Sequence, residues 1–164
     1  MHGRCPASPR IWLFPCALVC TLVCSGLSAA EEEANQAACA AKLQAMAPDD
    51  PAFKRLDKVF RQSLRFSGTV HRIVPHWHAT YQDLRAAKNK LSVQDIPYMV
   101  KGLALIDKLD ARQRVAVGVL GLFGVQALPC IEAALQDPGI KGRFMLEQIK
   151  IQIAVDRPSA TPAR

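Results

Sequence analysis

Three histidines within one eight-residue stretch are the first side chains of this sequence that could do chemistry. His71, His76 and His78 form the pattern His-x-x-x-x-His-Trp-His, and imidazole nitrogens bind Zn²⁺ and Cu²⁺. On a helix, however, His76 and His78 would point about 200° apart, and the nearest carboxylate along the chain is the distant Asp83. We therefore expect solvated imidazoles, with no resident metal and no cofactor. Weak metal binding and a pH-sensitive contact surface are the alternatives, because histidine titrates near neutral pH.

Cysteine is the second reactive residue type. The chain has 6 cysteines, but all except Cys39 and Cys130 fall within the first 30 residues, which have the character of an export signal. In an oxidising compartment the remaining two are expected to form a disulfide, which would close a loop of about 90 residues and stabilise the fold by roughly 4 kcal/mol. The alternative is two free thiols, with Cys130 reactive because it follows Pro129 at a predicted helix start.

Basic residues are concentrated in one block. Residues 54–90 hold nine lysines and arginines against only Asp57 and Asp83, whereas residues 31–53 are acidic and the rest of the chain is nearly balanced. Part of the block recurs at helical spacing, and such a face can dock an acidic protein. The alternative is the solvated side of an amphipathic helix. The predicted docking residues are Lys54, Lys58, Arg61, Arg65, Arg72 and His78.

No arrangement of residues in the sequence predicts catalysis. Ser63, Ser67 and Ser92 do not lie in the setting of a nucleophile elbow. The glycines spaced three apart in 118–124 lack the Lys-Ser/Thr of a phosphate-binding loop. A small helical domain also offers little room for the cleft and paired acids of a glycosidase. We therefore expect a protein that is not an enzyme.

The first 30 residues resemble a secretory signal peptide. Arg4 and Arg10 precede an apolar run over 11–27, and the small residues at 28–30 are followed by three glutamates at 31–33. This order predicts export to the periplasm or the cell exterior with cleavage after Ala30. An uncleaved membrane anchor is the alternative, because about 17 apolar residues approach the length that spans a bilayer. The expected organisation is a signal at 1–30, a helical domain at 31–157 and a disordered tail at 158–164.

Apolar residues in the rest of the chain recur with the period of a helix. The predicted helices cover about 31–47, 51–68, 75–90, 96–106, 110–123, 128–135 and 140–155. Several have recognisable start signals: Asp50 before Pro51, Ser92 and Asp95 at capping-box spacing, and Asp110. The pattern predicts an all-α domain of six or seven helices and no strands.

For two of the predicted helices, the apolar pattern also indicates which residues are buried. In the helix from Pro75 the expected core residues are Trp77 and Tyr81. In the last helix they are Phe144, Met145, Ile149 and Ile153.

An internal repeat joins two of the predicted helices. Residues 93–103 match residues 125–135 at an offset of 32, with Val, Gln, Pro and Leu identical. Stacked helical repeats keep the helix start and the buried face in this way.

The residues around the second copy resemble a HEAT-like repeat. Segment 112–138 has a basic residue before a Val-rich helix, a turn at Leu120-Gly121 and Gly124, an Ala-Leu-Pro helix start at 127–129, and Asp137-Pro138. The resemblance covers about residues 91–153 and implies a short stack of antiparallel helix pairs, a fold that usually serves as a binding scaffold. Gly142-Arg143-Phe144 departs from the family pattern.

Together these features predict an exported binding module that docks another macromolecule, a protein with an acidic surface, through a basic helix face. Two alternatives stay open at this point: an inhibitor or immunity protein that neutralises an enzyme in the same compartment, and metal binding by the histidines. Nucleic acid is not an expected partner, membrane contact requires an uncleaved signal, and the sequence leaves the oligomeric state open.

Overall fold

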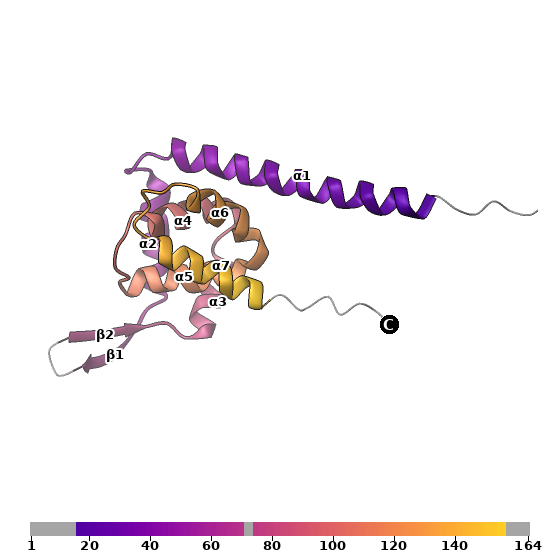
Figure 1. The fold of residues 1–164 in the computed structure, drawn as a ribbon. Coiled ribbons are helices and arrows are strands. Elements are labelled where there is room, and N and C mark those ends of the chain that lie inside the picture. The colour runs from indigo at the N-terminus through magenta and orange to yellow at the C-terminus, as the bar shows by residue number, and fades with distance from the viewer. Residues whose placement is uncertain (1–15, 71–73, 157–164) are drawn as a thin grey trace, which may run out of the picture.

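The structure of the protein is a computed structural model that describes residues 16–70 and 74–156, with side chains from residue 30 onward except at 67–70 and 74–76. His71, Arg72 and the predicted tail at 158–164 lie outside this description. The predicted all-α class is confirmed, and one short hairpin joins the helices (Figure 1). The elements are α1 (Cys16–Ala45), α2 (Pro51–Gln62), β1 (Arg65–Val70), β2 (Val74–His78), α3 (Tyr81–Asn89), α4 (Ile96–Ala104), α5 (Ala111–Phe123), α6 (Leu128–Leu135) and α7 (Arg143–Val155), with 3₁₀ turns η1 (Val93–Asp95) and η2 (Gly124–Ala127).

Side-chain caps fix the starts of several helices where the sequence predicted them. The Asp50 carboxylate accepts a hydrogen bond from the backbone N–H of residue 52 at 2.9 Å, just before the proline that opens α2. The Ser92 N–H donates to Asp95 at 2.8 Å, and Asp110 accepts from the Gln113 N–H at 2.9 Å. Both pairs form capping boxes, which satisfy backbone donors that a helix start leaves without partners.

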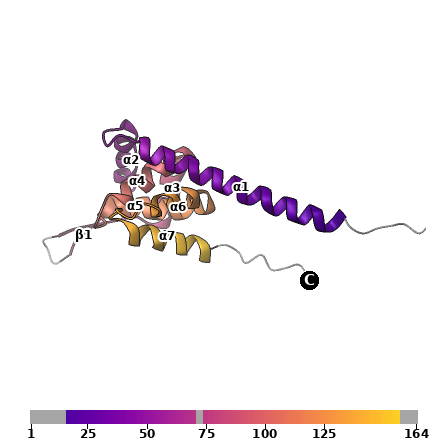
Figure 2. The ribbon, with the colours of Figure 1, turned by 45° about the horizontal axis from the view of Figure 1, so that its top comes forward.

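The core lies among the C-terminal helices. α5 packs against α2, α3, α4 and α7, while α4 also packs against α6. α1 lies along α6 and α4, and its N-terminal half projects beyond the other helices in both views (Figures 1 and 2). The largest fully buried side chains are Ile96, Leu103, Leu120, Ile131, Leu146, Val100, Val115, Val119 and Asp95.

The offset of 32 residues also relates helices that lie outside the two matching sequence segments. α4 and α6 both follow a 3₁₀ turn and carry proline in the first turn. α5 and α7 each have 13 residues, and their bounds differ by the same 32 positions as the sequence match. The buried faces differ, however, because α5 buries Val119 and Phe123 whereas Ile151 and Val155, at the equivalent positions of α7, are exposed.

One apolar segment of the described chain could cross a membrane by length and composition alone. It covers Ala111–Leu135 and contains a stretch of 18 residues with a mean hydropathy of 1.8, half of which is buried inside the protein. The chain turns within it at Gly124, whose φ of 59° lies in the left-handed region that favours glycine. Its apolar residues supply the centre of the core.

The main correction to the sequence prediction concerns residues 63–80. α2 ends at Gln62 rather than near Gly68, and no helix starts at Pro75. β1 and β2 instead form an antiparallel hairpin in which Phe66 lies opposite Trp77. The segment 67–74 contains a glycine and several β-branched residues, which lower helix propensity and suit a strand.

The last helix also differs from its prediction in its first residue and in the side chains that it buries. α7 begins at Arg143 rather than at residue 140, because the N–H of Gly142 bonds to the Ala104 carbonyl at 3.2 Å. A side chain at this glycine would overlap the carbonyl oxygen of Leu103, so the close approach requires glycine. The inward residues of α7 are Leu146 together with the predicted Ile149 and Ile153, whereas the predicted core residue Phe144 is 71% exposed.

Candidate functional site

The structure divides the predicted docking residues between a helix and the hairpin. Lys54, Lys58 and Arg61 lie on α2 and are exposed. Arg65 does not continue this helix: it is the first residue of β1 and lies opposite His78 of β2. The prediction of one continuous basic helix face is therefore wrong, because α2 ends at Gln62, before Arg65. α2 and the hairpin are consecutive, and the hairpin extends away from the helical body (Figure 1).

Ion pairs reduce the positive charge of the predicted face. Arg61 Nε lies 2.7 Å from the Asp57 carboxylate, which also receives Arg112 Nη1 at 2.9 Å. In the described part of the chain, no carboxylate forms an ion pair with Lys54 or Lys58. These two lysines therefore provide the uncompensated positive charge of α2.

Arg65 is held by the start of α3. Its Nε and Nη2 donate to the Asp83 carboxylate at distances of 2.7 to 3.0 Å. Asp83 also accepts from the Thr80 N–H at 2.9 Å and from its hydroxyl at 2.7 Å. The hydrogen bonds from Arg65, and then those from Thr80, hold the pKa of Asp83 well below its ordinary range, and the pKa of Arg65 is raised. This cluster fixes the base of the hairpin to α3.

Exposed aromatic side chains at the hairpin base are the feature that sequence reasoning missed. Phe66 is 55% exposed and Trp77 is 45% exposed, and their ring centroids are 5.3 Å apart across the two strands. Tyr81, at the start of α3, is 63% exposed and has the Arg85 guanidinium 6.0 Å from its ring centroid. The prediction that Trp77 and Tyr81 are core residues is wrong, because Trp77 lies on the projecting hairpin and Tyr81 lies at the exposed start of α3.

The histidines do not form a described metal centre. His71 lies outside the described residues, and the structure places only the backbone of His76. His78 is half-buried beside a cavity of about 190 Å³ that Trp77 and Leu84 also line. Within the described residues, no group of three or more His, Cys, Asp or Glu side chains could hold a metal ion.

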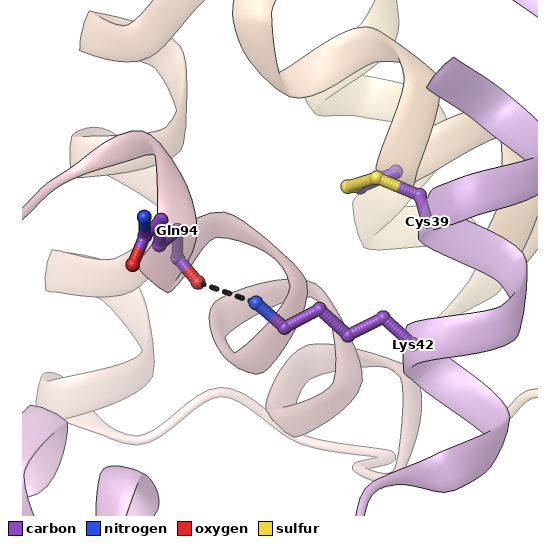
Figure 3. The surroundings of a disulfide bond; sticks show 4 residues. Cys39, Lys42 and Gln94 are labelled. Atoms are coloured by element: carbon purple, nitrogen blue, oxygen red, sulfur yellow. Dashed lines mark hydrogen bonds between the residues drawn. A yellow bond between two sulfur atoms is a disulfide. The ribbon is translucent and has the colours of Figure 1, made fainter. Parts of the chain in front are cut away.

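The disulfide between Cys39 and Cys130 is present and joins α1 to α6. The two Cα atoms are 5.1 Å apart. One turn further along α1, the Lys42 ammonium donates to the carbonyl oxygen of Gln94 at 3.2 Å (Figure 3) and lies 5.3 Å from the centroid of the Tyr98 ring. These anchors hold the second half of α1, which follows the predicted cleavage site.

A groove of about 560 Å³ lies between this half of α1 and helices α4 and α6. Its floor includes Leu43, Ala104 and Ala134, and Lys101 and Asp137 are among its polar residues. A smaller cavity of about 210 Å³ separates α2 from α4 and α5. Neither brings together the predicted docking residues.

No protein-family model, curated protein or solved structure matches this chain.

Proposed function

We propose that the protein is an exported binding module without enzymatic activity that docks a protein with an acidic surface through α2 and the hairpin. The observation that carries this proposal is the pair of exposed aromatic rings, Phe66 and Trp77, at the base of a hairpin that extends from the helical body. Aromatic side chains are enriched at the centres of protein interfaces, because they bury a large area at low entropic cost.

The charges near the aromatic pair favour an acidic partner. Lys54 and Lys58 are exposed on α2, and long-range attraction from such lysines raises the rate at which an acidic protein is captured. Arg65 has a different role, because its bonds to Asp83 orient the strand that carries Phe66. The proposed site thus combines an aromatic contact with nearby steering charge.

Export is supported by the position of the anchors on α1. Cys39, Lys42 and Leu43 attach this helix to the body, and cleavage after Ala30 would leave all three in the mature chain. The new helix end would carry the glutamates at 31–33, and acidic residues in a first turn stabilise a helix through its dipole. The disulfide also suits an oxidising compartment.

Affinity capture from the native host tests the docking surface. The exported protein is compared with two double variants, Lys54→Glu with Lys58→Glu, and Phe66→Ala with Trp77→Ala. The matched control is Lys90→Glu with Lys108→Glu, which reverses two exposed lysines outside the site. We expect a partner that is retained by the wild type and the control but lost from both site variants.

The identity of the captured partner distinguishes two roles of the same surface. A captured enzyme that the protein inhibits would assign an inhibitor or immunity role, and a non-enzymatic envelope component would assign a scaffold role. A partner that all variants retain equally would refute the assignment to α2 and the hairpin.

A further inference from the structure

A small cavity beside the aromatic pair is bordered by β2, α3 and the start of α5. Its volume is about 190 Å³. β2 contributes Trp77 and His78, α3 contributes Leu84, and α5 contributes Arg114 and Val115. Sites for drug-sized ligands have volumes of about 300 to 1,000 Å³, so this cavity has the size for a single side chain. Trp77 belongs both to the cavity and to the proposed docking surface.

The cavity has an apolar wall next to its basic residue. Leu84 lies against the backbone of α5 at Gly118, where an added Cβ would be 2.7 Å from Leu84 Cδ1. Gly118 follows Arg114 by four residues, and residues at this spacing share one face of a helix. Val115, which is buried, also lines the cavity. Arg114 therefore stands at the edge of an apolar surface.

Arg114 gives the cavity a positive charge that the described part of the chain does not neutralise. Its side chain is exposed, and no described carboxylate forms an ion pair with it. Asp83, on α3, is instead bonded to Arg65. Asp110, which caps α5, is bonded to Arg112. None of the described residues that line the cavity is acidic.

We propose that this cavity receives an aspartate or glutamate side chain of the acidic protein partner, with its carboxylate bound to the Arg114 guanidinium. A guanidinium can hold a carboxylate through two parallel hydrogen bonds, and apolar walls strengthen such a pair because they exclude water. A partner that covers the exposed part of Trp77 would bring its acidic residues within reach of Arg114, because both side chains line one cavity. The inference rests on the proposed function and extends the docking surface to α5.

Capture of the partner from the native host tests the contact with Arg114. Arg114→Gln removes the charge, and we expect it to weaken capture about tenfold or more. Arg114→Lys keeps the charge but loses the paired donors, so it should bind with intermediate strength. The matched control is Lys90→Gln, which removes one exposed charge at the C-terminal end of α3 and should leave capture unchanged. Far-ultraviolet circular dichroism checks that all variants keep their helices.

A small carboxylate tests the cavity without the partner. Propionate has the end of a glutamate side chain, and propionamide is its neutral counterpart of similar shape. Trp77 gives the only indole N–H resonance of the expected mature chain, because Trp12 lies in the predicted signal. In the exported protein with its disulfide intact, propionate in the millimolar range should shift this resonance saturably, and propionamide should not. Arg114→Gln should abolish the shift, and Lys90→Gln should keep it.

The inference is overturned if propionate and propionamide act alike on Trp77, or if the shift survives Arg114→Gln. It is also overturned if Arg114→Gln captures the partner as tightly as the wild type does. In that case the proposed docking surface still stands, provided that the double variants of α2 and of the aromatic pair lose the partner. A partner retained by those double variants but lost from Arg114→Gln would instead refute docking on α2 and the hairpin while supporting the contact at the cavity.

Discussion

The N-terminal and C-terminal regions of the molecule are held together by different kinds of interaction. Helices α4 to α7 share a continuous apolar core, in which Leu120, Ile131 and Leu146 are fully buried. The segment from α1 to β2 contributes few deeply buried residues, of which Leu56 is one. Its other attachments are a disulfide and single ion pairs, such as that between Arg65 and Asp83.

This difference separates stability from the proposed binding role. The C-terminal helices can supply most of the free energy of folding, because buried apolar area is the dominant favourable contribution. The N-terminal region can then leave Phe66 and Trp77 exposed, where the proposed partner would contact them. The disulfide and the ion pairs hold the N-terminal region in place, although this region buries little apolar area.

The largest effect is expected from removal of the disulfide. Replacing Cys39 and Cys130 with alanine releases α1 from α6 and removes a crosslink between residues 91 apart in the sequence. We expect the free energy of unfolding to fall by about 4 kcal/mol, since the crosslink restricts the unfolded chain. Urea denaturation followed by circular dichroism measures the change.

The control for this prediction is reduction of the wild-type protein. Dithiothreitol should lower the stability of the wild type toward that of the double variant and leave the variant unchanged. Hydrogen exchange should show the greatest loss of protection in α1. Equal loss of protection in α5 would contradict the view that the disulfide serves mainly to attach α1.

A core truncation in the C-terminal region is expected to have the next largest effect. Leu120→Ala removes a fully buried side chain in the C-terminal half of α5 and should lower the free energy of unfolding by about 3 kcal/mol. Phe66→Ala, in the N-terminal region, removes a larger but exposed side chain and should cost less than about 0.5 kcal/mol. Thermal and urea denaturation of both variants test the contrast. A loss of stability from Phe66→Ala equal to that from Leu120→Ala would show that the aromatic pair is structural.

The ion pair between Arg55 and Asp95 links the two regions. Asp95 is almost completely buried, and it accepts hydrogen bonds from Ser92 as well as from Arg55. Arg55→Ala leaves the buried carboxylate with fewer donors, so we expect a loss of about 1 kcal/mol in unfolding free energy. Lys54→Ala, which truncates the exposed neighbour, is the matched control and should change stability little. Equal stability of the two variants would contradict a role for the pair in attaching α2 to α4.

The C-terminal helices were predictable because their signals are local. The capping boxes at Ser92 and Asp110 and the turn at Gly124 are readable from the sequence itself, and the structure confirms them. The inward face of α7 was harder to predict, because Phe144 and Ile149 both belong to helically spaced apolar rows. Packing of Gly142 against the end of α4 decides which row turns inward, and no local signal gives that contact.

The hairpin was not predicted because its sequence combines helical spacing of aromatic residues with residue types that favour strands. Trp77 and Tyr81 are four residues apart, which fits a helix, while the β-branched residues of 69–74 favour strands. A helix through Arg65 gives no sign of its bond with Asp83, because only the hairpin brings the two side chains together. The aromatic pair was missed for the same reason, whereas the cysteine pair follows from composition and the expected oxidising compartment, and the structure confirms the disulfide.

The smallest change in global stability is expected at the hairpin base, where pH gives the test. Asp83 has a pKa lowered by Arg65 and Thr80, so its contribution is complete above the ordinary aspartate pKa of about 3.9 and is lost only as pH falls through the lower folded value. The bond between Arg65 and Asp83 should therefore persist between neutral pH and about pH 4. Asp83→Asn removes the charge that holds Arg65 and should loosen the hairpin at every pH.

Tryptophan fluorescence measures this local change. Trp12 lies in the predicted signal, so Trp77 is the only tryptophan of the mature chain. We expect the Trp77 emission of Asp83→Asn to lie at longer wavelength than that of the wild type, both at neutral pH and at about pH 4. Asp107→Asn, which removes an exposed carboxylate paired with Lys141, is the matched control and should behave as the wild type. Identical emission from all three proteins would mean that packing of the rings, rather than the ion pair, orients the hairpin.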